Sequence, residues 1–450
     1  MTKQASAAAK DLAVAGVGGA QIAWADNNGI PRSRIVPLNG LAAAATRGIG
    51  ITSLFAVFDT HDVITFGHPG LATPSGDVRL VPVVERLRRL AGQPALAWAP
   101  GRQIAADGSP WPYCQRTALE NVVSVTSQRG YEIRAGFEME FAVAPAGAAG
   151  IASAPGHPGP AYSPHALIPL DDFVATLLHD LDANGLRLNQ FHAEYGLAQL
   201  ELSLAATDPV SAADDQLLAR QTLHAAAHKH GLRLSFAPMV SPDAAGNGWH
   251  LHTSAWRKGR NLLAGAGVPG ADGAGYLAGL LRDLSAVTAV TAPSVPSTLR
   301  LRPGYFASAY AFWGVENREA PLRYVPGTPL LGDDHANVEL KPCDASANPY
   351  LALAAVITSG IAGLEEGLSL PDPVGEDPGT WPEDRRAAAG ICRLPDTSAE
   401  QDSALASCDR MREALGAELL GAFRAVRASD RSWAVDRTVD EIVAAHLWRY

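Results

Sequence analysis

Residues 136–141 read GFEMEF, an apolar run flanked by aromatic residues that carries two glutamates on alternate positions. In an extended strand, residues i and i+2 point to the same face, so Glu138 and Glu140 are predicted to stand side by side. Two neighbouring carboxylates repel each other unless a cation lies between them. On its own the hexapeptide favours a half-exposed strand whose polar face meets water, so other segments have to decide.

The composition limits the class of protein. A chain of 450 residues is long enough for two domains. The net charge of −10 argues against nucleic acid and anionic membrane surfaces as partners. No apolar run approaches the roughly 20 residues that cross a bilayer. The four cysteines form no CxxC pair, which favours a reducing compartment. We therefore expect a cytoplasmic protein that binds neither nucleic acid nor a membrane.

Turn and periodicity signals divide the chain near residue 108. Residues 1–108 are predicted to form a small β-rich domain with one helix at 83–92 and strands at 21–26, 33–38, 51–59 and 94–100. Residues 109–450 are predicted to form a larger α+β domain with a surface loop at 147–164. Its predicted helices lie at 115–129, 171–185, 273–291, 347–367 and 398–428. A further predicted helix follows the segment 208–215 and ends at residue 231. Its predicted strands lie at 187–194, 199–205, 232–240 and 249–256.

Four strand candidates in the larger domain each place an acid or a histidine in apolar company. These side chains are Glu138 and Glu140, Glu194 and Glu201 in 192–202, His250 and His252 in 246–252, and Glu339 in 337–342. Each alone is most often a solvated side chain, but a cluster of unpaired buried carboxylates would cost several kcal/mol each. Oxygen-rich ligands with a histidine suit Mg²⁺ or Mn²⁺ better than zinc, and such cations usually serve phosphate chemistry.

No GxxxxGK[ST] loop is present, so a nucleotide would have to be held by metal ions and arginines. The guanidinium group matches phosphate and carboxylate oxygens well. The candidates are Arg300, Arg302, Arg318 and Arg323.

Taken in order, these motifs resemble those of the glutamine synthetase family over most of the chain. They are GFEMEF, HAEYGLAQLE, GNGWHLHTS, PSVPSTLRLRPGY, NREAPLR and VELKPCDASANPYLALAA. The resemblance implies an α+β fold with a small N-terminal β-grasp domain at 1–108. Residues 109–450 would form the large catalytic domain, which is similar to guanido kinases and has a curved antiparallel sheet.

The resemblance also implies the site residues. Two divalent cations, Mg²⁺ or Mn²⁺, would be held by two sets: Glu140, Glu194 and Glu201, and, next to the ATP phosphates, Glu138, His250 and Glu339. Ser254, Arg318 and Arg323 would contact ATP, with Arg318 and Arg323 on the transferring phosphoryl group. Gly246, Arg300, Lys341 and Phe306 would line the substrate site, with Arg300 on the amino-acid carboxylate. The enzyme would phosphorylate a carboxylate and let an amine attack the acyl phosphate.

Departures from the family pattern surround the substrate rather than the metal ions. Phe306 stands where the family has the glutamate that receives ammonium, and Ala245 and Lys341 replace an asparagine and an arginine. We expect a ligase that joins glutamate, or a related acid, to an organic amine. The alternatives are an ordinary glutamine synthetase that uses ammonia and a non-catalytic scaffold or regulator.

The family's double rings imply a homododecamer with active sites between subunits. An aspartate of the N-terminal domain would then reach the neighbouring site. Asp59 and Asp62 are both candidates.

Overall fold

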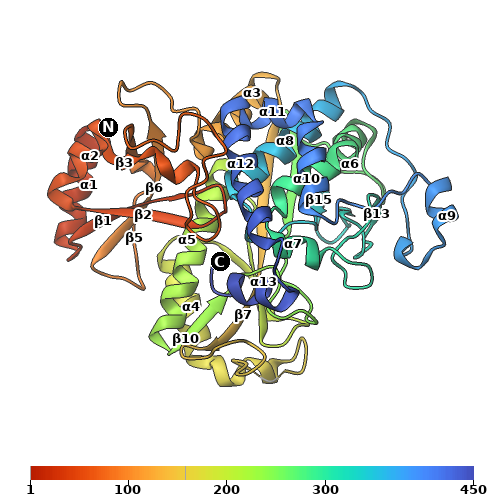
Figure 1. Ribbon diagram of the computed structural model, residues 1–450, viewed down its shortest axis with the longest axis horizontal. Helices are drawn as coiled ribbons and strands as arrows, with labels where there is room; N and C mark the ends of the chain where they lie inside the picture. Colours follow the sequence, from red (N-terminus) through yellow and green to blue (C-terminus); the bar gives the residue numbers. More distant parts are fainter. Residues whose placement is uncertain (1, 158) are drawn as a thin grey trace.

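The computed structural model describes residues 2–157 and 159–450, so Pro158 in the predicted loop 147–164 lies outside the described residues. Two sheets organise these residues (Figure 1). The first has the strand order β2-β1-β6-β4-β3, with β5 paired to β6. Its strands are β1 (Gly19–Ala25), β2 (Pro31–Pro37), β3 (Ile49–Thr52), β4 (Asp77–Pro82), β5 (Arg88–Arg89) and β6 (Leu96–Ile104). The helices α1 (Thr2–Val14) and α2 (Leu41–Arg47) accompany this sheet.

The predicted helix at 83–92 is wrong. The segment makes one 3₁₀ turn, Val84–Arg86, and then the short strand β5. Arg88 pairs with Trp98 and Arg89 with Ala97 of β6. A segment this short forms few helical hydrogen bonds of its own, so pairing with a neighbouring strand outweighs its helical pattern.

The second sheet has the order β13-β14-β15-β11-β7-β9-β8, with β10 on β7 and β12 on β11. Its pairs are antiparallel except for the parallel pair β13 and β14. Its strands are β7 (Glu132–Pro145), β8 (Leu188–Ala193), β9 (Gln199–Leu204), β10 (Leu232–Ser235), β11 (Leu251–Arg257), β12 (Arg260–Asn261), β13 (Trp313–Val315), β14 (Leu322–Val325) and β15 (Asn337–Leu340).

The strand β7 contains GFEMEF and lies between β11 and β9. Phe137, Met139 and Phe141 are fully buried on the face that packs into the main core. Alternation therefore sends Glu138 and Glu140 to the opposite face, as predicted. The α+β fold with a curved, mainly antiparallel catalytic sheet follows the sequence-based expectation. The boundary at residue 108 stays a prediction.

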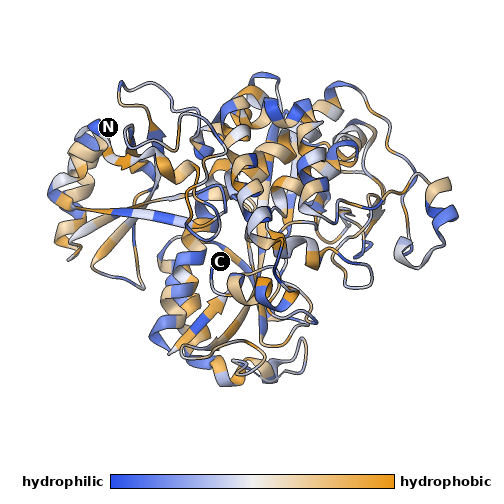
Figure 2. Ribbon diagram, viewed as in Figure 1, coloured by the Kyte–Doolittle hydropathy of each residue, from blue (hydrophilic) through white to orange (hydrophobic). Residues whose placement is uncertain are grey.

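Helices surround the second sheet (Figure 1). They are α3 (Gln115–Gln128), α4 (Asp171–Ala183), α5 (Pro209–Lys229), α6 (Ala271–Thr291), α7 (Val295–Arg300), α8 (Pro349–Glu365), α9 (Glu383–Ala388), α10 (Ser398–Ala406), α11 (Asp409–Leu415), α12 (Ala417–Ala434) and α13 (Val439–His446). In Figure 2, α4 carries both hydrophilic and hydrophobic residues, and its Phe173, Leu177 and Leu181 are buried. Within the described ranges, no helix is long and apolar enough to cross a membrane.

The sequence-predicted helices α3, α4, α6 and α8 are confirmed to within a few residues, whereas α5 begins at Pro209, inside the segment 208–215 after which it was predicted to start. The single helix predicted at 398–428 is wrong, because α10, α11 and α12 occupy this region. Cys408 has an extended backbone at the start of α11, and Gly416 adopts a φ of 81° before α12. A left-handed residue cannot continue a right-handed helix, so the chain turns at each end of α11.

Candidate active site

Neighbouring strands bring the predicted carboxylates and histidines together. On one side of β7, Glu140 is paired with Glu201 of β9, and Glu201 in turn with His192 of β8. On the other side, β11 pairs with both β7 and β15, and its His252 lies opposite Glu339. The polar face of the sheet therefore carries two clusters, one on each side of β7.

The first cluster contains Glu138, His250, His252 and Glu339. His250 Nδ1 lies 3.5 Å from Glu138 Oε2 and 3.3 Å from Glu339 Oε1. His252 Nε2 lies 3.2 Å from Glu138 Oε1. Glu138, His252 and Glu339 each offer a ligand atom within 4.8 Å of the others. The sequence prediction named His250 as the ligand here, and the structure adds His252.

The second cluster contains His192, Glu194 and Glu201, which also offer ligand atoms within 4.8 Å of one another. His192 Nε2 lies 3.3 Å from Glu201 Oε1, and His192 Nδ1 lies 3.8 Å from Glu194 Oε1. The sequence prediction placed Glu140 with Glu194 and Glu201, whereas His192 was not predicted.

Glu140 lies between the two clusters. Its Oε2 accepts hydrogen bonds from Gln199 Nε2 and from the backbone N–H of Gly248, both at 2.8 Å. Its Oε1 lies 3.7 Å from His250 Nε2. A Cβ on Gly248 would meet His250 Nε2 at 2.5 Å and Glu140 Oε1 at 2.9 Å. Only glycine lets the backbone come this close to both side chains.

The charges in these clusters are strongly coupled. Burial would raise the pKa of Glu138, but hydrogen bonds from His250 and His252 outweigh it and lower that pKa well below its ordinary value. Burial would lower the pKa of His252, yet Glu138 raises it to about 9. The hydrogen bond to Glu201 raises the pKa of His192 to about 9. Without a cation between them, the carboxylates depend on protonated histidines for compensation.

The donor set fits divalent cations. Converging carboxylate oxygens with imidazole nitrogens at the edge are typical of sites for ions of the Mg²⁺ and Mn²⁺ class. Lone pairs within 4.8 Å of one another need a positive centre to relieve their repulsion. A cation in the first cluster could be bound by Glu138, His252 and Glu339 with His250. A cation in the second cluster could be bound by Glu194 and Glu201 with His192 or Glu140.

Two cationic side chains border the first cluster. Arg323 Nη1 donates to Glu339 Oε2 at 2.7 Å, and Lys341 Nζ lies 3.6 Å from Glu339 Oε1. Arg318 is exposed on the turn between β13 and β14. Ser254 is buried on β11, and its hydroxyl accepts a hydrogen bond from Trp256 Nε1 at 2.8 Å. Three of the four residues therefore lie in or next to the strands that carry the cluster.

Arg300 is the last residue of α7 and is buried. Its Nη2 donates to the carbonyl oxygens of Cys343, at 2.9 Å, and Lys341, at 3.3 Å. A Cβ on Gly246 would lie 2.5 Å from Arg300 Cγ. Of the sequence-predicted substrate residues, Arg300 thus contacts both the Lys341 backbone and the surroundings of Gly246.

The segment 303–308 follows α7 and carries Phe306, whose side chain is 65% exposed. Phe306 has a φ of 53° and Ser308 a φ of 69°, both in the left-handed region that non-glycine residues rarely adopt. The backbone N–H groups of Gly304 and Phe306 lie against the carboxylate of the buried Glu319. Burial, followed by the charge of Asp377, raises the pKa of Glu319 to about 7.

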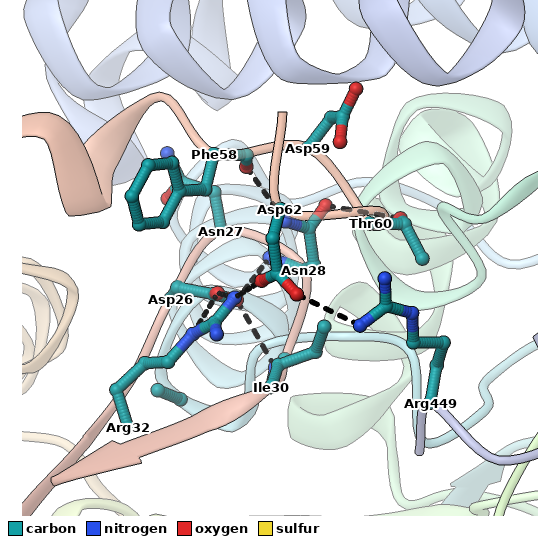
Figure 3. Close-up of polar contacts among 12 residues, drawn as sticks. Asp26, Asn27, Asn28, Ile30, Arg32, Phe58, Asp59, Thr60, Asp62 and Arg449 are labelled. Atoms are coloured by element: carbon teal, nitrogen blue, oxygen red, sulfur yellow. Dashed lines mark hydrogen bonds and ion pairs between the residues drawn. The ribbon is translucent and has the colours of Figure 1, made fainter. Parts of the chain in front are cut away.

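The two N-terminal aspartates both have partners within the chain. Asp59 is buried, and its carboxylate accepts hydrogen bonds from the backbone N–H of His61 and Val63 and from the Ser429 hydroxyl. Asp62 is more exposed, at 43% of its side chain, and pairs with Arg32 at 2.7 Å and Arg449 at 2.8 Å. Figure 3 shows Asp62 between these two arginines.

Sequence reasoning missed His192 and Glu319 as candidates, and it named His252 on the strand face without assigning it as a ligand. The two histidines were visible in HAE and HLH, because each lies two positions from a predicted ligand and therefore on the same strand face. Glu319 had no such signal, since its neighbours come from the segment 303–308 and from Asp377.

Carboxylates, histidines and an arginine that converge from adjacent strands are the set of side chains expected in a metal-dependent enzyme of phosphate chemistry. Residues 112–442 match the family model described as "Glutamine synthetase, catalytic domain". The chain belongs to the glutamine synthetase family. Members of this family depend on ATP and divalent metal ions, and the protein is a ligase that forms C–N bonds.

Individual relatives agree with this assignment. The chain is 43% identical over its full length to the gamma-glutamylpolyamine synthetase GlnA3 of Streptomyces coelicolor, of which it covers 97%. It is 28% identical to a glutamine synthetase of Pyrococcus abyssi, over 88% of this chain and 86% of the relative. A solved glutamine synthase homologue superimposes with a TM-score of 0.85 at 30% identity, covering 96% of this chain and 99% of that chain.

Proposed function

We propose that the protein is a cytoplasmic enzyme that uses ATP to join the γ-carboxylate of glutamate to an organic amine, with polyamines as the first candidates. The observation that carries the proposal is Phe306, an exposed apolar side chain where the family pattern has an ammonium-binding glutamate. The relation to a gamma-glutamylpolyamine synthetase over the full chain supports the same choice.

Two Mg²⁺ or Mn²⁺ ions would supply positive charge to the ATP phosphates and to the transferring phosphoryl group. Glu138, His250 and Glu339 would hold one ion, and Glu140, Glu194 and Glu201 the other. Arg323 is already oriented by Glu339, so its guanidinium can contact the phosphoryl oxygens with little reorganisation. The exposed Arg318 would approach the same group from the turn, and Ser254 would contact ATP.

On the acid side, Arg300 would bind the carboxylate of the amino acid, with Gly246 allowing its close packing and Lys341 adding positive charge. On the amine side, the exposed rings of Tyr305 and Phe306 offer an apolar surface to the methylene groups of a polyamine. A neutral ring does not bind an ammonium ion as a carboxylate does, so ammonia should be a poor substrate.

The test is phosphate release from ATP with glutamate, measured with ammonium and with a panel of amines that runs from polyamines through ethanolamine and alkylamines to aniline. We expect release with polyamines and little with ammonium, and Phe306→Glu should raise the activity with ammonium. Release with ammonium alone would identify an ordinary glutamine synthetase. No release with any amine would favour a different acid or a non-catalytic scaffold, which calorimetric ATP binding would then separate.

We also propose a homododecamer in which the N-terminal region of one subunit contributes to the site of its neighbour. Of the two candidate aspartates, Asp62 is the more exposed. Mass photometry should then give the mass of twelve chains of 47.1 kDa each. A mass of one or two chains would contradict the proposal.

A further inference from the structure

The segment 303–308 is held at both of its ends by distant parts of the chain. Before it, Arg302 Nη2 donates a hydrogen bond to the carbonyl oxygen of Ala244 at 2.9 Å. After it, the carbonyl oxygen of Ala309 accepts a hydrogen bond from the backbone N–H of Leu394 at 2.9 Å. The two ends are therefore fixed, and the conformation between them depends on what holds the residues in the middle.

The middle of this segment has an unfavourable backbone and few bonds of its own. Phe306 and Ser308 both adopt a left-handed φ, of 53° and 69°. Among the residues that the structure describes, residues 304–308 take part in no backbone–backbone hydrogen bond. The buried hydroxyl of Ser308 has no hydrogen-bond partner in the same described part of the chain. Such a conformation persists only where other groups hold it, so the segment needs an anchor.

The carboxylate of Glu319 is in the position of this anchor. The backbone N–H groups of Gly304 and Phe306 both lie against it, and Glu319 is only 6% exposed. A carboxylate has acceptor sites for several N–H groups at once, and hydrogen bonds to an ionised acceptor are stronger than those to a neutral one. One side chain thus binds the segment at two backbone positions, one of which belongs to Phe306.

Glu319 is itself held in place. Its backbone N–H donates to Asn317 Oδ1 at 3.0 Å. Asn317 Nδ2 in turn donates to the carbonyl oxygens of Val374 and Glu376, both at 2.9 Å. Because the acceptor is fixed before it binds the segment, the segment takes one position relative to Arg318, the neighbour of Glu319 in the chain.

We propose that Glu319 is a positioning residue for the amine side of the reaction. Its carboxylate anchors the segment 303–308 through the backbone N–H groups of Gly304 and Phe306. The anchored segment fixes the place at which the exposed rings of Tyr305 and Phe306 meet the methylene groups of an organic amine. This inference deepens the proposed function and rests on it for the class of substrate, whereas the anchoring can be measured without any substrate.

Amide hydrogen exchange of the full-length protein tests the anchor directly. In Glu319→Ala, exchange in residues 304–308 should accelerate by about tenfold, the effect of losing one hydrogen bond to a charged acceptor. Glu319→Gln should exchange nearly as the wild type does, because its amide oxygen still accepts a hydrogen bond. The matched control is Glu383→Ala, an exposed change on α9 that should leave this segment unchanged. Equal exchange of residues 304–308 in Glu319→Ala and in the wild type would overturn the proposal.

Steady-state kinetics of phosphate release separate positioning of the amine from general support of the fold. Glu319→Ala should raise the KM for the polyamine by about tenfold. It should change the KM for ATP and for glutamate much less, since Arg323 and Arg300 keep their own contacts. Glu319→Gln should restore most of the KM for the amine. Equal increases in all three KM values would overturn the proposal, as would a KM for the amine that is as high in Glu319→Gln as in Glu319→Ala.

Glu319→Asp keeps the test decisive if Glu319→Ala does not fold, which circular dichroism determines. The aspartate retains the charge on a shorter side chain, so exchange in residues 304–308 and the KM for the amine should both rise. An aspartate variant identical to the wild type in both measurements would overturn the proposal. A wild type that releases no phosphate with any amine would overturn the proposed function instead, and the exchange of residues 304–308 would then decide alone whether Glu319 anchors the segment.

Discussion

At the scale of single residues, Glu319 is a carboxyl group outside the two clusters whose pKa is raised strongly by its surroundings. Its pKa of about 7 in the folded protein exceeds the ordinary value of 4.5, mainly because it is buried. The folded state therefore binds the proton more tightly than the unfolded state. The stability that this proton contributes is complete below about pH 4.5 and is lost as the pH rises toward 7.

Glu319→Gln should remove this pH dependence. A shift of this size corresponds to about 3 kcal/mol at most. Between about pH 5 and about pH 8, the free energy of unfolding of the wild type should fall relative to that of the variant by up to this amount. Denaturant titrations across this range measure the difference. The exposed Glu383 on α9 provides the control, because Glu383→Gln should give a difference from wild type that stays constant. A constant difference for Glu319→Gln would contradict the prediction.

Gly246 is a second position that decides the geometry of the site, because there is no room for a side chain there. A Cβ there would lie 2.3 Å from the carbonyl oxygen of Pro238 and 2.5 Å from Arg300 Cγ. Gly246→Ala should therefore cost about 1–3 kcal/mol of stability and raise the KM for the acid by displacing Arg300. Gly147→Ala, with no atom within 4 Å of the added carbon, should stay within about 0.5 kcal/mol of wild type. An unchanged KM in Gly246→Ala would count against a role for Arg300 in binding the acid.

At the scale of elements, the helices α6 and α8 pack through glycines. A Cβ on Gly279 would meet the carbonyl oxygen of Ser359 at 2.2 Å and the Cα of Gly363 at 2.8 Å. In an exposed helix, replacing glycine by alanine stabilises by about 1 kcal/mol. Here the contact reverses the sign, so Gly279→Ala should lower the free energy of unfolding by roughly 1–3 kcal/mol. Chemical denaturation measures this, with Gly375→Ala as the uncrowded control. A stabilised Gly279→Ala variant would show that the helices can separate without cost.

Elements with a strong local pattern could be predicted from the sequence, and those defined by distant contacts could not. The alternation in GFEMEF identified β7 and the face of its two glutamates, because a half-buried strand repeats every two residues. The segment 83–92 failed because its partner strand β6 overrides a short helical pattern. The prediction for 398–428 ignored Gly416. A glycine inside a helical pattern is a helix-ending signal that the sequence does carry, and in the structure Gly416 has a left-handed φ.

The same distinction holds for the site. The convergence of six side chains was predictable, because motif spacing places them on strands or directly at strand ends and the sheet brings them together. Glu138, Glu140, Glu201 and Glu339 lie on strands, and Glu194 and His250 lie next to the ends of β8 and β11. The individual hydrogen bonds among these neighbouring side chains were not predictable. The hydrogen bonds that Glu140 accepts from Gln199 and from the backbone of Gly248 are one example, since only the folded chain determines them.

At the scale of the whole molecule, the N-terminal segment that carries Asp59 and Asp62 is bound to the last helices of the chain. Asp430 of α12 accepts two hydrogen bonds from Thr60, one from its backbone N–H at 2.9 Å and one from its hydroxyl at 3.1 Å. Arg449, next to the last residue, holds Asp62 (Figure 3). Residues 370 or more positions apart in sequence thus fix this segment from both sides.

Asp430→Ala should release the segment from the C-terminal helices. Asp430 is buried, so its loss leaves the backbone N–H of Thr60 without its acceptor and the buried Arg427 without its ion-pair partner, which costs about 1–3 kcal/mol. Because the bonds are local to this contact, amide exchange should accelerate in residues 59–65 more than in the strands of the second sheet. Hydrogen–deuterium exchange of the intact protein measures this, and Asp436→Ala, an exposed change just after α12, is the control. Uniform acceleration over the whole chain would mean that Asp430 supports global stability rather than this contact. If the proposed assembly is correct, the same variant should also lose activity. The loss should follow the fraction of chains in which residues 59–65 are released, because the neighbouring site would lack its N-terminal contribution.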